Sequence, residues 1–418
     1  MEVDITVNNS RGKDARYLTW APSPLRLRLI DVPLAPPTTS TVIVTLASER
    51  DPTGGDLLFR AASPTAPKPT PTLKVALPRN GSSVTVMVSG RFGRPSVADG
   101  DVRIVARFKN NVIGRRPVMV RVRKDAARFS AAERDRFVAA LAQLNDRGTG
   151  RFADFRNMHV QASTNEAHGA AGFLPWHRAY LLDLERELQA IDPSVALPYW
   201  RFDRPAASLF TREFLGETDG LGNAEFHPAN PLTFWTTDGV LGVIRRSQPG
   251  FDPATMAARG VFSEADTLAL GTNFAAFTSM EGNPHGIAHT SSFSGPITSV
   301  PTAARDPLFF LLHCNVDRLW ARWQHTNKRY DPAQPASYAS GATPTSLRVG
   351  HNLNDTMWPW NGVVTPPRPV NAPGGTLSRS PTVSMPGPQP RVRDMLDYQG
   401  SVVPASMLGF AYDDVPFR

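Results

Sequence analysis

Two apolar stretches decide the fold of this chain: FLPWHRAYL at residues 173–181 and DPLFFLLHCNVDRLW at residues 306–320. Each stretch has the apolar spacing of a helix, and each carries a single histidine, His177 in the first and His313 in the second. A buried imidazole costs free energy unless its ring nitrogens have partners. We therefore predict two buried helices whose histidines bind something in the protein interior.

Four further histidines precede these stretches, two upstream of each. The resulting groups of three are His159, His168 and His177, followed by His285, His289 and His313. Three ligands in each of two groups is the ligand count of two neighbouring three-coordinate metal ions. In the segment HGIAH, residues 285–289, the spacing of four places both imidazoles on one face of a helix. The six histidines are therefore candidate metal ligands.

The residues around the histidines narrow the choice of metal. Neutral imidazole binds zinc, copper, iron and nickel. Gly286 stands where a zinc protease needs the glutamate that follows the first histidine of its motif, and no carboxylate has the spacing of a di-iron site. The only cysteine, Cys314, adjoins His313 on the predicted helix, so its side chain points about 100° away from the metal. Ligation by histidine alone favours a pair of copper ions.

Both stretches resemble the copper-binding segments of the tyrosinase and polyphenol oxidase family, which includes the catechol oxidases and carries a type-3 dicopper centre. The similarity extends from about Ser130 to Gln324 and includes LPYW at residues 197–200. Carried over by position, it implies that the first three histidines hold one copper ion and the last three hold the other. Leu312 replaces a histidine that is frequent in the family. No cysteine lies near His168, as it does in some eukaryotic members, so the site is similar to bacterial members.

The resemblance implies an oxidoreductase that uses two copper ions and dioxygen to oxidise o-diphenols (catechols) to o-quinones. It leaves open whether o-aminophenols are also substrates and whether phenols are hydroxylated. The alternative is a haemocyanin-like protein that binds oxygen reversibly with a similar copper pair. A carrier needs a blocked substrate mouth, whereas an enzyme needs an open one.

The resemblance also assigns roles to three residues near the ligands. Glu281 is similar to the family's glutamate that holds a water near the second copper, where it can help to deprotonate a phenol. Gly286 stands where good monophenolases often have asparagine, so we expect catechols to be better substrates than monophenols. Val300 resembles the position above the copper pair that controls entry, and valine leaves the mouth open. The plain alternatives are an exposed acid at a helix N-terminus for Glu281 and core packing for Val300.

For the remaining polar residues near the predicted helices, the sequence suggests structural roles rather than roles in metal binding. Asp317, one turn after His313, is expected to accept a hydrogen bond from an imidazole, or else to pair with Arg318 or Arg322. Three histidines lie outside the two groups and are expected at the surface: His227, His325 and His351.

The chain of 418 residues predicts a multidomain α+β protein. Residues 1–125 alternate in the manner of strands, for example at residues 25–30, 83–88, 102–106 and 118–122, and predict a β-sandwich accessory domain. Residues 126–418 predict a mainly helical copper-binding bundle with a core at 130–325 and a C-terminal wrapping segment, 326–418, of irregular chain and short strands.

Expected helix starts in this second domain follow local signals. Ser130 and Glu133 form a capping box, Pro175 opens the helix of His177, and Asp306 followed by Pro307 begins the helix of His313. With a single cysteine, the chain has no internal disulfide framework.

Net positive charge is concentrated in the first domain, residues 1–125, which contains 20 lysines and arginines but only 10 aspartates and glutamates. A basic surface can attract acidic partners, but the chain lacks a nucleic-acid-binding motif and an apolar run long enough to cross a membrane. We expect neither nucleic acid nor membrane as a partner, and the sequence does not predict the oligomeric state.

The first residues do not resemble a signal peptide, so a cytoplasmic location is expected, with export by another route left open.

Overall fold

The structure is a computed structural model that describes residues 1–30, 40–63, 65, 67–160, 164–219, 221–247, 258–291, 293–340, 349–363 and 377–417. It is a mixed α/β protein whose chain divides into two compact units. The first unit comprises Met1–Val122 together with Pro381–Val383 and Gly409–Phe417. The second comprises Arg123–Ser380 and Ser384–Leu408.

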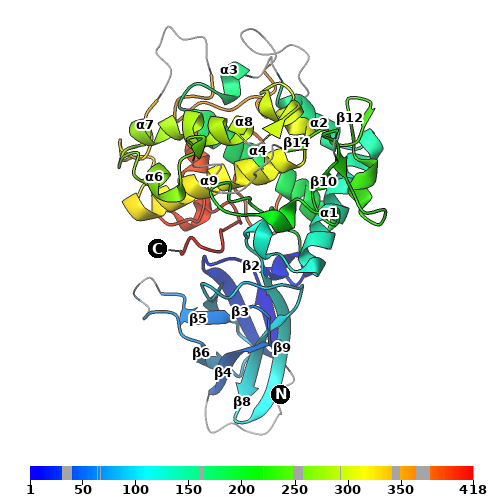
Figure 1. Cartoon of the computed structure of the whole chain (residues 1–418). Coiled ribbons are helices and arrows are strands. Elements are labelled where there is room, and N and C mark those ends of the chain that lie inside the picture. Colours follow the sequence, from blue (N-terminus) through cyan, green and yellow to red (C-terminus); the bar gives the residue numbers. More distant parts are fainter. Residues whose placement is uncertain are drawn as a thin grey trace. The chain divides into compact units, whose positions relative to one another are not determined.

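Two sheets, drawn in blue to cyan in Figure 1, build the first unit. The four-stranded sheet has the order β1 (Glu2–Val7), β3 (Ser23–Ile30), β7 (Val84–Gly90) and β5 (Leu57–Ala61). The five-stranded sheet has the order β2 (Tyr17–Leu18), β9 (Asn111–Val120), β8 (Val102–Phe108), β4 (Thr41–Arg50) and β6 (Thr72–Pro78). All pairs are antiparallel except β2 with β9. Three of the strands expected from the sequence coincide with β3, β7 and β8 to within two residues, whereas the strand expected at 118–122 overlaps only the end of β9, which begins at Asn111.

Strand alternation explains the core of this unit. In β3, Leu25, Leu27 and Leu29 are buried, whereas Arg26 and Arg28 between them are exposed, as the two-residue period of a strand requires. Buried side chains from both sheets form one hydrophobic cluster.

A segment from the far end of the sequence completes that cluster. Ala411 belongs to it, and the Trp20 indole donates a hydrogen bond to the Tyr412 carbonyl at 2.8 Å. The sequence placed residues 409–417 with the wrapping segment of the catalytic domain. In the structure they cluster with the N-terminal strands.

Helices dominate the second unit (Figure 1). The α-helices formed by its described residues are α1 (Ala131–Asn145), α2 (Phe152–Met158), α3 (Thr164–Ala167), α4 (Phe173–Ile191), α6 (Glu264–Leu268), α7 (Phe274–Phe277), α8 (Ile287–Ser291) and α9 (Leu308–Asn327). Short turns of tighter or wider helix join them, among them η7 (Thr278–Glu281), η8 (Gly282–Gly286) and η9 (Pro296–Thr298). The described residues of this unit also form three two-stranded pairs: β10 (Glu217–Thr218) with β11 (Ala224–Glu225), β12 (Thr236–Thr237) with β13 (Val240–Leu241), and β14 (Arg246–Ser247) with β15 (Phe293–Ser294).

The helix starts follow the sequence signals with small shifts. The capping box at Ser130 and Glu133 is confirmed. Helix α4 begins two residues before Pro175, which lies in its first turn. Pro307, rather than Asp306, occupies the N-cap of α9. Asp306 still accepts a hydrogen bond from the Leu308 amide at 2.9 Å.

The part of the chain described after α9 contains two short 3₁₀ turns, η11 (Val392–Met395) and η12 (Pro404–Ser406), and one isolated bridge between Thr356 and Arg391. The short strands expected there are absent from the described residues, because proline and glycine leave few consecutive residues able to form a ladder. Among all the residues that the structure describes, no helix combines the length and apolar character that crossing a bilayer requires.

Candidate metal centre

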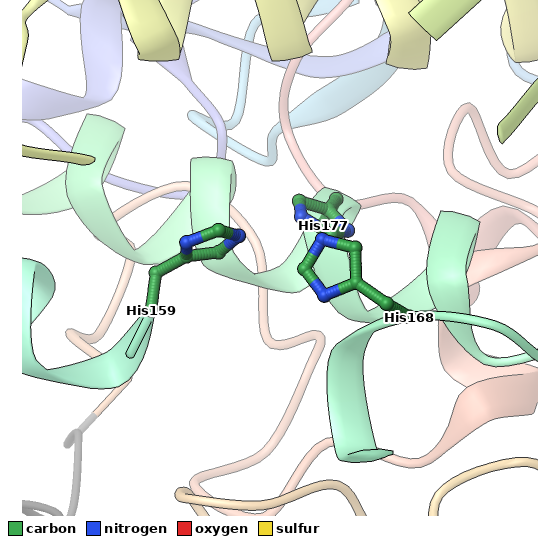
Figure 2. Close-up of side chains that lie close together, drawn as sticks. All are labelled: His159, His168 and His177. Carbon is green, nitrogen blue, oxygen red and sulfur yellow. The ribbon is translucent and has the colours of Figure 1, made fainter. Parts of the chain in front are cut away.

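The two groups of histidines expected from the sequence are both formed in space. In each group, one nitrogen per residue lies within 4.8 Å of the others. Figure 2 shows the rings of the first group directed toward one another. None of the six residues is more than 9% exposed. The two groups adjoin, because the rings of His177 and His313 stack with centroids 4.3 Å apart.

Different elements supply the six side chains. The first group comes from the end of α2 (His159), the residue after α3 (His168) and the first half of α4 (His177). The second group comes from η8 (His285), α8 (His289) and α9 (His313). A local break precedes His285, since Asn283 is extended, and the chain from His285 to His289 is helical. The ring centroids of these two histidines are 4.8 Å apart, so the rings lie together, as their spacing predicted.

Backbone carbonyls orient three of the rings. Nδ1 of His177 donates to the Phe173 carbonyl at 2.9 Å, Nδ1 of His285 to the Glu281 carbonyl at 2.7 Å, and Nδ1 of His289 to the Ile297 carbonyl at 2.7 Å. A neutral imidazole that donates from Nδ1 keeps the lone pair of Nε2 free, and such a bond fixes the tautomer and direction of a metal ligand. These three rings are therefore set to coordinate through Nε2.

The distances within the second group fit a metal ion. Nε2 of His313 lies 3.3 Å from Nε2 of His285 and 3.2 Å from Nε2 of His289. Ligand nitrogens about 2.0–2.1 Å from a tetrahedral metal lie roughly 3.3 Å from each other. In the first group, Nε2 of His177 and both ring nitrogens of His159 are buried without a hydrogen-bond partner among the described residues. Buried polar atoms rarely remain without a partner, and a metal ion would provide one.

Burial also sets the charge of the rings. It lowers the pKa of His159 to about 3 and that of His289 to about 4. Burial is likewise the main cause that lowers the pKa of His168, His177 and His313 well below the usual value, and the same holds for His285. Neutral rings are the form that coordinates a metal, so the donor set is available at neutral pH.

Glu281 connects the two groups. Its carbonyl accepts from the His285 ring, and its carboxylate Oε1 accepts from the backbone amide of Gly169, which follows His168, at 2.7 Å. The side chain lies at the edge of a cavity of about 600 Å³ that Gly169 and Phe274 also line. Glu281 is half-buried, so it is not the freely exposed helix acid of the plain alternative.

Gly286 and Val300 differ in their surroundings. A Cβ at position 286 would meet only the Glu281 carbonyl, at 3.4 Å, so a larger side chain has space there. Val300 is 38% exposed, which is inconsistent with plain core packing. Its backbone lies close to His159 and partly offsets the burial that lowers the pKa of that ring.

Asp317 has partners that the sequence did not suggest. Its carboxylate accepts from Nε of Arg178 at 2.6 Å and from Nη1 of Arg123 at 3.1 Å. Arg123 in turn binds Glu185 at 2.8 Å. Arg178 extends from α4 and Asp317 from α9, so these ion pairs join the helices that carry His177 and His313.

Of the three histidines expected at the surface, His227 is exposed, His325 is half-buried, and His351 is completely buried. The prediction is therefore wrong for His351. Its ring is enclosed because it bonds to backbone groups at both ends of the segment 165–172, here named the His168 loop. Those partners lie more than 170 residues away in sequence, and no local pattern signals them.

Comparisons with known proteins identify the family of this chain. The family model described as the common central domain of tyrosinase matches residues 149–326, which contain all six histidines. The tyrosinase of Streptomyces glaucescens is 34% identical over 270 residues, covering 57% of this chain and 92% of that protein. The tyrosinase of Streptomyces antibioticus is 34% identical over 275 residues, covering 57% and 93%. A solved tyrosinase from Burkholderia thailandensis aligns with 18% identity and a TM-score of 0.43, covering 70% of this chain and 75% of that one.

The site and these relatives define a type-3 copper oxidoreductase. The chain belongs to the tyrosinase family, whose members oxidise phenols with copper.

Proposed function

We propose that this protein oxidises o-diphenols to o-quinones with dioxygen. The observation that carries the proposal is the convergence of six buried, neutral imidazoles in two adjoining groups of three. We assign one copper ion to each group. The ligands of the first are His159, His168 and His177, and those of the second are His285, His289 and His313.

The bound copper pair would supply the exchange of electrons between dioxygen and the phenolic oxygens. The protein contributes orientation and exclusion of water. Carbonyl bonds aim the Nε2 atoms of His177, His285 and His289, and three neutral ligands for each ion leave a position open for oxygen or substrate. Burial of the rings keeps bulk water from the reacting atoms.

Glu281 is the proposed acceptor of a phenolic proton. Its carboxylate is fixed by the Gly169 amide, 2.7 Å away, at the edge of a cavity that admits water. A monophenol must lose a proton with a pKa of ~10 before it can be hydroxylated. Gly286 has no side-chain amide with which to polarise a water held by Glu281, so this deprotonation is expected to be the weak step.

We therefore expect catechols to be oxidised much faster than the corresponding monophenols. Gly286→Asn should raise the monophenol rate more than the catechol rate, by about 10-fold, which corresponds to about 1.4 kcal/mol of barrier. The open space at position 286 accommodates the new side chain. Initial rates on a matched monophenol and catechol pair, at equal copper content, measure the effect. Equal rates in the unaltered protein, or equal gains in the variant, would contradict this role.

Val300 offers a second test of the site. Val300→Phe replaces a partly exposed side chain near His159 with a larger one. We expect it to slow both substrates by roughly 3- to 10-fold, or about 1 kcal/mol, while leaving their ratio nearly unchanged, because a narrower mouth limits entry rather than proton transfer. Steady-state kinetics on both substrates provide the measurement. A large change in the ratio would mean that Val300 selects between substrates.

A reversible oxygen carrier is the alternative function. The exposure of Val300 favours an enzyme, since a carrier needs a covered mouth. Oxygen uptake after adding catechol to copper-loaded protein separates the two. Sustained uptake supports the oxidase, and almost no uptake beyond binding supports the carrier.

For the first unit we propose a β-sandwich accessory domain that precedes the helical catalytic bundle. Support comes from the two sheets that contribute to one hydrophobic cluster. No candidate ligand lies among residues 1–125, so the copper chemistry is assigned to the second unit.

A further inference from the structure

His351 is fully buried beside the loop that carries His168. Nδ1 of its ring accepts a hydrogen bond from the backbone amide of Gly172 at 3.1 Å. Nε2 is 3.0 Å from the backbone carbonyl of Asn165, to which it donates. The ring therefore connects both flanks of the segment that contains His168.

The two hydrogen bonds are mutually consistent. An amide donor at Nδ1 requires an unprotonated nitrogen there, and a carbonyl at Nε2 requires a proton, so the neutral Nε2–H tautomer satisfies both. The fit is close as well as polar. A Cβ on Gly172 would meet the Gly350 carbonyl oxygen and would lie 2.7 Å from Nδ1 of His351, so glycine permits both the ring and its backbone to approach the loop.

The backbone that carries His351 is itself held in place. One carboxylate oxygen of Asp355 accepts from the amides of Gly350, His351 and Asn352 at 3.0–3.3 Å. The Tyr338 hydroxyl donates to the His351 carbonyl at 2.9 Å. The His351 ring therefore extends toward the His168 loop from a turn that these hydrogen bonds hold in place.

The ring of His168 lacks the carbonyl that orients three of the other five ligands. His177, His285 and His289 each have a carbonyl that orients Nδ1, whereas Nδ1 of His168 is buried without a hydrogen-bond partner among the described residues. The preceding helix, α3, has only four residues. The direction of the His168 ring is therefore set by where its loop is fastened.

We propose that His351 is a positioning residue that fastens the His168 loop and thereby retains copper in the first group. The inference rests on the proposed function, because it takes His168 to be a copper ligand. His351 itself touches neither metal nor substrate in this assignment.

The test compares three variants of the full chain. His351→Phe keeps a ring but removes both hydrogen bonds, and His351→Gln keeps a donor and an acceptor. His325→Phe is the matched control, because His325 is a half-buried histidine outside the site. The measured quantities are copper per chain after dialysis at limiting free copper and the rate of copper transfer to a chelator.

We expect His351→Phe to lose copper from one of its two sites about 10-fold faster than the unaltered protein, as residues that support a metal ligand do when replaced. His351→Gln should recover most of the loss, and His325→Phe should show none. A general loss of stability would not be rescued by glutamine and would release both ions. Gly172→Ala, which would push both the Gly350 carbonyl and the His351 ring away from the loop, should reproduce the defect even if His351→Phe fails to fold.

Pairing with His168→Ala identifies the site that is affected. Once His168 is absent, His351→Phe should add little further loss, because the two substitutions act on one ligand. The inference is overturned if His351→Phe holds both ions normally, or if its effect is undiminished in the His168→Ala background. If His168→Ala alone retains two ions, the ligand assignment fails instead.

Discussion

His313→Ala is expected to reduce copper binding from two ions to one per chain and to lower catechol oxidation on the order of 10³-fold. His313 is completely buried on α9, and its Nε2 is within 3.3 Å of the Nε2 atoms of both other ligands in its group. A metal ion contributes several kcal/mol to catalysis, and each 1.4 kcal/mol corresponds to about a factor of ten in rate. Metal analysis and oxygen uptake measure the two effects.

His177→Ala should produce the same pair of effects through the other ion. His325→Ala is the control for α9, since this histidine lies on the same helix but outside the group. Retention of two ions in His313→Ala, or binding of a single ion by the unaltered protein after copper loading, would contradict the coupled pair.

The second large effect is expected for stability. Asp317→Ala should lower the free energy of unfolding of the second unit by about 3–5 kcal/mol, the usual result of removing one partner from a buried ion pair. Asp317 binds Arg178 and Arg123, and both arginine side chains are fully buried. Arg178 also lies over the ring of Trp320, 3.7 Å from its centroid. Without the carboxylate, the buried positive charges lose their shared partner.

Urea unfolding of the metal-free protein followed by tryptophan fluorescence measures this effect. Trp20 is the only tryptophan of the first unit, so the signal reports mainly on the second. Asp135→Ala is the matched control because its pair with Arg134 is exposed, and exposed pairs contribute about 0–1 kcal/mol. A loss below about 1 kcal/mol in Asp317→Ala would mean that the network adds little net stability.

The sequence predicted the parts of the site that obey local rules. His177 and His313 interrupt apolar helical patterns, and His285 and His289 share a helical spacing, so their grouping follows from backbone geometry. His159 and His168 lie at helix ends. Only their position before His177 suggested them as ligands, and the family resemblance then assigned them to the first copper ion. The β-strands of the first unit followed equally local alternation.

Contacts between distant segments could not be predicted in this way. His351 resembles any histidine in an asparagine-rich loop, and only its distance to the Gly172 amide reveals its place. The arginines that bind Asp317 come from another helix and from the start of the second unit. Tertiary packing determines such pairs, and it produces no periodic pattern in a single sequence.

The packing of Ala411 and Tyr412 with the N-terminal strands has a consequence for the order of events during synthesis. These residues leave the ribosome only after residues 123–408 have been made, which takes tens of seconds at about 5–20 residues per second. During that interval the first unit lacks Ala411 in its cluster and the carbonyl that accepts from Trp20. The N-terminal strands therefore emerge well before the segment that completes their cluster, and the nascent chain must keep this apolar surface from aggregating until then.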